Sequence, residues 1–171
     1  MATLAETDYT KLSTDAAERF VDLYYSALDS HRSTLQTFYV PTLTQDSGRG
    51  LPSITYNGEL ISDSASFQER WENHMPRTSI QIQSVNAHVL NPVLAPLPGD
   101  AKKRDAEKNV SLIVQVSGTV RLGEPKEGPL RAFGDSFVLV PNTEVATGVG
   151  GKEGGGGKRW LIQSQAFRFV V

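Results

Sequence analysis

The C-terminal stretch 158–171, KRWLIQSQAFRFVV, constrains the fold more than any other part of this chain. Most domains leave their last residues polar and poorly ordered, so a terminus that carries Phe167 and Phe169 must be packed. The apolar residues also change phase, because Trp160 and Ile162 fall on even positions and the two phenylalanines on odd ones. Side chains alternate between the two faces of a strand. The stretch therefore predicts an interior strand rather than a free tail.

This change of phase has two explanations. Either both faces of the strand carry apolar groups, or a bulge between Gln163 and Ala166 resets the register. In both cases Arg168 lies on the face opposite Phe167 and Phe169. A charged side chain in an interior strand needs a partner, and we expect the partner of Arg168 to lie on another polypeptide. The alternative is a strand arginine that extends to solvent.

The composition limits the classes of function. The chain has 171 residues, 39% hydrophobic and 21% charged, which is typical of one globular domain. A net charge of −2 gives no global basic field, so any nucleic-acid contact needs a local patch. The lack of cysteine and the three scattered histidines predict neither a metal site nor a cofactor. We find no signal peptide and no apolar run of about 18 residues, so we expect a nuclear or cytoplasmic protein without a membrane partner.

The N-terminal third has the pattern of a long amphipathic helix. Ser13 or Thr14 can cap it, Pro41 ends it, and we expect the polar segment 1–12 to be a flexible lead. Asp29 and Arg32, three residues apart, predict a local ion pair. The apolar residues that recur at helical spacing are Ala16, Phe20, Tyr24, Ala27, Leu28, His31, Leu35 and Phe38.

The rest of the chain reads mainly as strands. Asn57-Gly58 indicates a hairpin turn, and a phase change near Gln83–Ser84 predicts a bulge. Two segments, 91–108 and 141–157, are expected to be long exposed loops of a single domain 13–171. Helices come first and strands later, which predicts an α+β fold with a bent antiparallel sheet around the first helix. The predicted elements after that helix are strands 51–56 and 59–61, a short helix at 62–76, and strands 78–90, 110–122, 130–140 and 158–171.

Several motifs follow one another in a specific order. The first helix reads FVxxYYxxLDxxRxxLxxFY from Phe20, and Tyr56-Asn57-Gly58 and Met75-Pro76 come next. GTV from Gly118, FxxxFxL from Phe133, WxI from Trp160 and FRF from Phe167 mark the last three strands. Together these motifs resemble the nuclear transport factor 2 (NTF2) family, from about residue 13 to the end. The resemblance implies a cone-like fold in which the bent sheet wraps around the long N-terminal helix.

Within this family, the chain looks most like the small subunits of heterodimeric mRNA export receptors, which pair sheet face to sheet face with a related domain of the large subunit. The resemblance implies a non-catalytic role in which Arg168 pairs with an acidic residue of that partner. Gln165 stands where the family often has Asp, and Asp135 where it often has Gln. The implied partner-interface residues are Arg168, Asp135, Phe133, Phe137, Gln165, Ala166, Trp160 and Ile162.

The resemblance also implies contacts beyond the large subunit. The dimer is expected to bind phenylalanine-glycine repeats of nuclear pore proteins and to shuttle between nucleus, pore and cytoplasm. It is also expected to bind RNA through a composite surface, with Lys102, Lys103 and Arg104 as candidate contacts. Asp105 and Glu107 dilute this basic cluster, so a solvated loop is the simpler interpretation.

Two other functions are compatible with the sequence. One is a homodimeric import carrier for GDP-bound Ran, although the segment 122–129 (LGEPKEGP) mixes charges instead of forming an acidic rim. The other is an isomerase, dehydratase or small-molecule binder that uses the cone as its cavity. For that function Tyr24, Tyr25, Asp29, His31 and His88 are the candidates, but we expect His31 in the core and His88 pointing outward.

Overall fold

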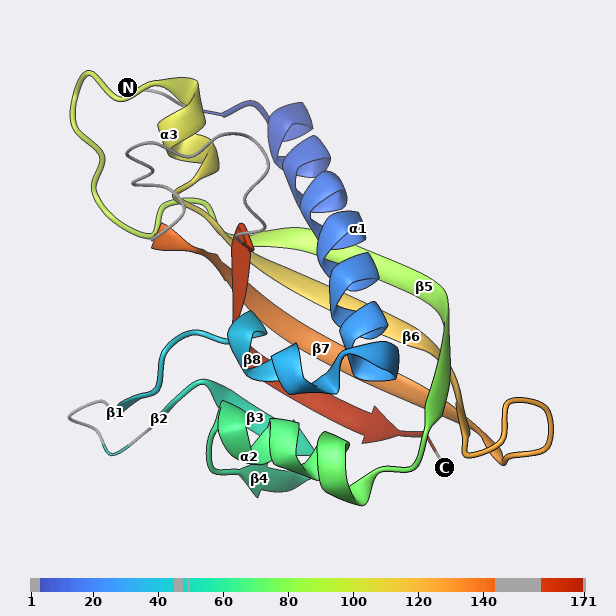
Figure 1. The fold of residues 1–171 in the computed structure, drawn as a ribbon. Coiled ribbons are helices and arrows are strands. Elements are labelled where there is room, and N and C mark those ends of the chain that lie inside the picture. Colours follow the sequence, from blue (N-terminus) through green and yellow to red (C-terminus); the bar gives the residue numbers. More distant parts are fainter. Residues whose placement is uncertain (1–3, 45–47, 49, 144–157, 171) are drawn as a thin grey trace.

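The computed structural model describes residues 4–44, 48, 50–143 and 158–170, in which a long helix crosses one face of a six-stranded sheet (Figure 1). Two short helices, α2 and η2, cover the same face near the C-terminal end of the last strand. The elements are α1 (Glu6–Ser30), η1 (Arg32–Phe38), β1 (Leu43–Thr44), β2 (Gly50–Leu51), β3 (Ser53–Tyr56), β4 (Glu59–Ile61), α2 (Ser64–Glu69), η2 (Arg70–His74), β5 (Thr78–Asn91), α3 (Lys103–Glu107), β6 (Ser111–Leu122), β7 (Leu130–Pro141) and β8 (Trp160–Phe169).

The sheet is mixed rather than purely antiparallel. Its strand order is β4-β3-β8-β7-β6-β5, and β5 to β8 form an antiparallel meander. The pairing of β3 with β8 is parallel, with Ile54 opposite Gln165. The prediction of an antiparallel sheet is wrong for this pair. Because the two strands are far apart in the sequence, no turn between them could have revealed their relative direction.

The first helix begins earlier and ends earlier than its apolar spacing predicts. It begins at Glu6, where the Asp8 carboxylate accepts a hydrogen bond from the Ala5 amide (3.1 Å) and the acidic first turn suits the helix dipole. The prediction of a flexible lead is therefore wrong for residues 6–12. After His31 the chain continues as the 3₁₀ helix η1, so the predicted single helix is two helices.

The bulge explanation for β8 is confirmed. Ile162 pairs with Leu139 and Ser164 with Val138, so Gln163 is an extra residue without an opposite partner. This insertion places Trp160, Ile162 and Phe167 on one face, which we call the inner face because α1 packs on it. The opposite face is called the outer face. The predicted bulge in β5 is also present, between Ile82 and Ser84.

The core lies between α1 and the inner face. It is rich in aromatic rings: Phe20 contacts Phe137 at a centroid distance of 5.0 Å, and Phe133 stacks on Phe167 at 5.5 Å. Each such side chain contributes about 1.5–3 kcal/mol when it is fully buried. Trp71, from η2, is completely buried at the C-terminal end of this cluster. The interior of the cone is therefore filled by the chain's own side chains.

The segment 91–108 is not a plain exposed loop. It contains α3, which is tied to α1 by an ion pair between Lys103 Nζ and Asp8 Oδ1 (2.8 Å). Asn109 is buried behind it and bonds both the amide and the carbonyl of Ala95. Most of the other predicted loop, residues 144–157, lies outside the described residues.

Within the described part of the chain, no helix is both long enough and apolar enough to span a bilayer.

Candidate partner interface

The outer face of the sheet carries a hollow with a floor of small residues. Gly134 pairs with Arg168, and Ser136 with Ala166, across the β7–β8 ladder. Thr55 of β3 pairs with Ala166 from the other side. The hollow has a volume of about 480 Å³.

Among the described residues, nothing requires a glycine at position 134. A Cβ added to it would meet no heavy atom within 4 Å beyond its chain neighbours, and its φ lies outside the left-handed region. Glycine inside a strand costs roughly 0.5–1 kcal/mol relative to alanine. Such a glycine often marks a place where another backbone or ligand approaches closely. Gly134 therefore points to contact with a molecule other than this chain.

Arg168 stands at the rim of the same hollow and is exposed. Its guanidinium reaches over the hairpin turn, 3.8 Å from the position that a Cβ on Gly58 would occupy. None of the ion pairs among the described residues includes Arg168. The side chain is thus free to pair with a carboxylate from outside.

Six of the eight predicted interface residues do not reach the outer face. The bulge at Gln163 and the alternation of β7 turn them inward, where α1 covers them. Their direct contact with a partner stays a prediction, whereas Arg168 and Ala166 are exposed on the outer face. The six inward residues are Phe133, Asp135, Phe137, Trp160, Ile162 and Gln165.

A buried polar cluster lies directly beneath the outer face. Tyr25 Oη donates to Asp135 Oδ2 (2.9 Å), and Gln165 Nε2 donates to both carboxylate oxygens (3.0 and 3.1 Å). Tyr24 and Tyr39 bond to Gln165 from the other side. Burial raises the pKa of Asp135 well above its usual range, and the hydrogen bonds from Tyr25 and Gln165 offset this only in part.

Asp135 and Gln165 form one hydrogen-bonded pair, which explains their exchange relative to the family pattern. With Asp on β7 and Gln on β8, the same two functional groups still meet between neighbouring strands. Our reading of the sequence noted both departures but did not pair them. Their reciprocal nature was the signal that could have revealed the contact.

The candidates for catalysis are not brought together. Asp29 accepts hydrogen bonds from Thr78 Oγ1 (2.7 Å) and the Ile80 amide (3.0 Å), which is a structural role. His31 is exposed at the end of α1, contrary to the expected core position, and His88 is exposed as predicted. Tyrosine donors around a carboxyl group suit acid–base chemistry, but the side chain of Asp135 is sealed beneath aromatic rings.

The predicted ion pair between Asp29 and Arg32 is not formed within 4 Å. The Arg32 guanidinium instead donates to the carbonyls of Trp71 (2.7 Å), Met75 (2.9 Å) and Pro76 (2.8 Å). Its Nε donates to the Leu28 carbonyl (2.9 Å). Carbonyl groups at the end of η2 compete successfully for the guanidinium because they match its planar fork of donors.

The candidate RNA contacts are only partly free. Lys103 is engaged by Asp8; this ion pair lowers the pKa of Asp8 and raises that of Lys103. Lys102 is exposed, and Arg104 lies 4.0 Å from Asp105. Two of the three cations thus remain available on this surface.

The arrangement of a long helix across a bent six-stranded sheet is the NTF2-like fold. A chain in the structure of the Chaetomium thermophilum Mex67 NTF2-like domain complexed with Mtr2 aligns with a TM-score of 0.73 and 21% identity, covering 93% of this chain and 99% of that chain. A structure of Mtr2 aligns with a TM-score of 0.71, 19% identity and the same coverage. The predicted fold class is confirmed.

Sequence comparison gives a more specific likeness. The chain is 26% identical to NTF2-related export protein 1 of Bos taurus over 169 residues, which span 99% of this chain and 96% of that protein. No protein-family profile matches the chain. An enzyme-like neighbour, a putative scytalone dehydratase from Novosphingobium aromaticivorans, aligns with a lower TM-score of 0.59 and 13% identity. Structure comparison thus gives the NTF2-like fold, and sequence comparison gives a likeness to an NTF2-related export protein.

Proposed function

We propose that this chain is the non-catalytic small subunit of a heterodimeric mRNA export receptor. Its outer sheet face covers the NTF2-like domain of a large, Mex67-type subunit. The observation that carries this proposal is the hollow around Gly134, a glycine for which the isolated chain gives no reason. The likenesses to Mtr2 and to an NTF2-related export protein support the choice of partner.

The mechanism is structural. Small side chains in the hollow let the partner approach closely, and Arg168 at the rim pairs with a partner carboxylate that burial removes from water. When one member of such a buried pair is lost, the other remains charged and uncompensated, which costs roughly 3–5 kcal/mol. The ion pair therefore stabilises a dimer with an acidic partner. It disfavours a homodimer, because a second copy of this chain would present another arginine.

Co-expression with the NTF2-like domain of the large receptor from the same organism tests this proposal. We expect a 1:1 complex by light scattering after size-exclusion chromatography, and at least a hundredfold weaker affinity for Arg168→Glu. Lys126→Glu makes the same change of charge in the β6–β7 turn, away from the hollow, and this control should bind as the native chain does. A chain that stays monomeric beside this domain contradicts the proposal, and a homodimer that binds GDP-bound Ran supports the import-carrier alternative.

The proposal extends to the cargo and the route. The assembled receptor binds phenylalanine-glycine repeats during passage through the pore, shuttles between nucleus and cytoplasm, and binds RNA through a composite surface that includes Lys102 and Arg104. Each phosphate contact adds about 0.7–0.9 to the slope of log affinity against log salt. Replacing Lys102, Lys103 and Arg104 with alanine should lower this slope by about one to two for single-stranded RNA. An unchanged slope in filter binding removes this surface from the proposal.

A further inference from the structure

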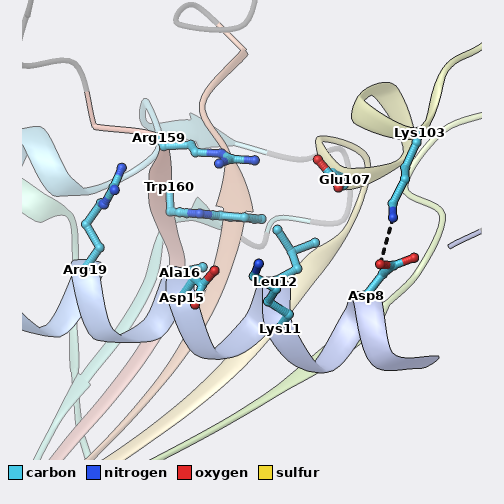
Figure 2. Close-up of a pocket in the computed structure, with 10 residues that line it drawn as sticks. All are labelled: Asp8, Lys11, Leu12, Asp15, Ala16, Arg19, Lys103, Glu107, Arg159 and Trp160. Atoms are coloured by element: carbon cyan, nitrogen blue, oxygen red, sulfur yellow. Dashed lines mark hydrogen bonds and ion pairs between the residues drawn. The ribbon is translucent and has the colours of Figure 1, made fainter. Parts of the chain in front are cut away.

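A groove runs along one flank of α1, away from the outer face (Figure 2). It consists of a pocket of about 330 Å³ between α1, α3 and the start of β8, and a smaller pocket of about 30 Å³ further along α1. The two pockets share Arg19, Arg159 and Trp160. From Asp8 to Leu23 the groove follows about 22 Å of helix.

The floor of the groove is apolar. Leu12, Ala16 and Trp160 form it in the larger pocket. In the smaller pocket the floor is formed by Phe20, Phe38 and Leu23. Leu23 is 51% exposed, which is high for a large aliphatic side chain that borders an apolar hole. An apolar group from another molecule would bury both surfaces there.

The charges are unevenly distributed along this floor. Arg19, Lys158 and Arg159 line the smaller pocket without any carboxylate among its lining residues. Arg159 lies over Trp160, while Lys103 and Asp8 join at the opposite end of the groove (Figure 2). The two pockets together have five cationic residues, Lys11, Arg19, Lys103, Lys158 and Arg159, and three carboxylates, Asp8, Asp15 and Glu107. This excess of positive charge occurs in a chain whose net charge is −2.

We propose that this groove binds an acidic peptide segment of a partner protein. One aliphatic side chain of the peptide enters the small pocket beside Leu23, and flanking Asp or Glu residues contact Arg19, Lys158 and Arg159. The Lys158 ammonium already lies 4.2 Å from the centroid of Phe38 and donates to Thr37 Oγ1 (2.6 Å), so one cation is held in place beside the pocket.

The geometry favours a peptide over RNA. Single-stranded RNA binds to grooves of this kind by stacking bases on exposed aromatic faces. Trp160 and Phe38 are only 5% and 4% exposed, so their rings offer no face to a base. The smaller pocket admits the end of an aliphatic side chain but not a nucleobase. The groove also lies on the opposite side of the sheet from the proposed large-subunit interface, so both can be occupied at once.

A random 12-residue peptide library displayed on phage tests this inference on the full chain. We expect enriched peptides with a net charge of −3 or lower and at least one Leu, Ile or Val. A fluorescein-labelled copy of the most enriched peptide should bind at least tenfold more weakly to Arg19→Glu/Arg159→Glu and to Leu23→Asp. The matched control Arg77→Glu/Lys126→Glu reverses two exposed cations elsewhere and should bind like the native chain.

Three results would overturn the inference. They are the absence of enrichment above uncoated beads, enriched peptides that are neutral or basic, and equal binding by the groove variants and the control. A labelled 12-nucleotide oligouridylate provides the comparison with RNA. If its binding falls in the groove variants while the acidic peptide does not compete with it, the groove is an RNA site. Melting temperatures of all variants within 2 °C of the native chain show that the fold is intact, and heterodimer formation should be unchanged.

Discussion

At the scale of single residues, the buried carboxyl of Asp135 determines how stability responds to pH. Burial raises its pKa, so the folded state holds its proton to a higher pH than the unfolded state does. The stabilisation by the protonated form is complete below the unfolded pKa of about 4 and is lost as pH rises through the folded pKa. Raising the pH above the unfolded pKa of Asp135 therefore carries a cost in folding stability.

Asp135→Asn should remove this cost. The amide keeps an acceptor for Tyr25 Oη, and rotation of the Gln165 amide by half a turn supplies an acceptor for the new NH₂ group. We expect the variant to be more stable than the native chain at pH 8 and to show a flatter dependence between pH 5 and 8, measured by urea unfolding. Asp22→Asn, at an exposed position of α1, is the control. If Asp135→Asn kept the pH profile of the native chain, this carboxyl would not be the cause of the pH dependence of stability.

Arg32 is the second residue on which the fold depends. Its guanidinium joins the end of α1 to the last carbonyls of η2 and to Thr78 at the start of β5. Because hydrogen bonds to charged groups contribute about 1.5–3 kcal/mol each and are not additive, Arg32→Ala should destabilise the chain by roughly 2–4 kcal/mol. Arg32→Lys should recover less than half of the stability lost in Arg32→Ala, since the lysine ammonium lacks the planar set of donors of a guanidinium. Arg77→Ala is the exposed control in chemical denaturation, and a loss no larger than that of the control would contradict this role.

Sequence reasoning worked for residues whose role depends on strand phase and failed for those that depend on distant partners. The even position of Arg168 placed it correctly on the face opposite Phe167 and Phe169. Local spacing misassigned Arg32, because its acceptors belong to residues 71–76 and become neighbours only when η2 packs beside α1. Asp135 and Gln165 were named as partner-interface residues because the family pattern names an interface but not the direction of each side chain, although the phase that Asp135 shares with Phe133 and Phe137 also allowed it to face the concavity.

At the scale of elements, the bulge in β8 decides which side chains enter the core. One inserted residue, Gln163, lets Ile162 and Phe167 share the inner face although their positions differ in phase. Deleting it would force one half of the strand to turn its apolar residues outward. The phase change in the sequence predicted either this bulge or a strand with apolar groups on both faces, and the structure shows the bulge.

Removal of Gln163 should therefore abolish cooperative folding, whereas Gln163→Ala should keep the bulge and lose less than about 1 kcal/mol, as expected for a half-buried side chain outside the core. The two variants can be compared by urea unfolding followed by tryptophan fluorescence, since Trp160 and Trp71 are both buried in the native state. A deletion variant that unfolds cooperatively at the native midpoint would show that the register does not depend on this residue.

The local sequence pattern could not predict other features of the elements, namely their ends and some of their pairings. The first turn of α1 is joined to α3 by the ion pair between Asp8 and Lys103, which are distant in the sequence. The parallel pairing of β3 and β8 likewise joins segments that no turn connects. Periodicity within one element was sufficient for the long strands and the core face of α1, but not for ends and pairings that tertiary contacts fix.

At the scale of the whole molecule, the two faces of the sheet have separate roles. The inner face is filled by α1 and the aromatic core, which leaves no room there for a substrate. The outer face has an unfilled hollow with Arg168 at its rim. The core is filled by the described residues themselves, whereas the hollow on the outer face is not.

The variant Gly134→Val distinguishes the stability of the isolated chain from its binding to a partner. Because an added side chain would point into open space, the isolated chain should become more stable by roughly 0.5–1 kcal/mol through the loss of glycine's freedom in the unfolded state. The partner domain should raise the melting temperature of the native chain in a concentration-dependent way, since ligands that bind only the folded state stabilise it by mass action. The variant should lose this shift, because the valine fills the space that the partner needs. A variant that is destabilised alone, or that keeps the full shift, would show that Gly134 serves the chain itself rather than its partner.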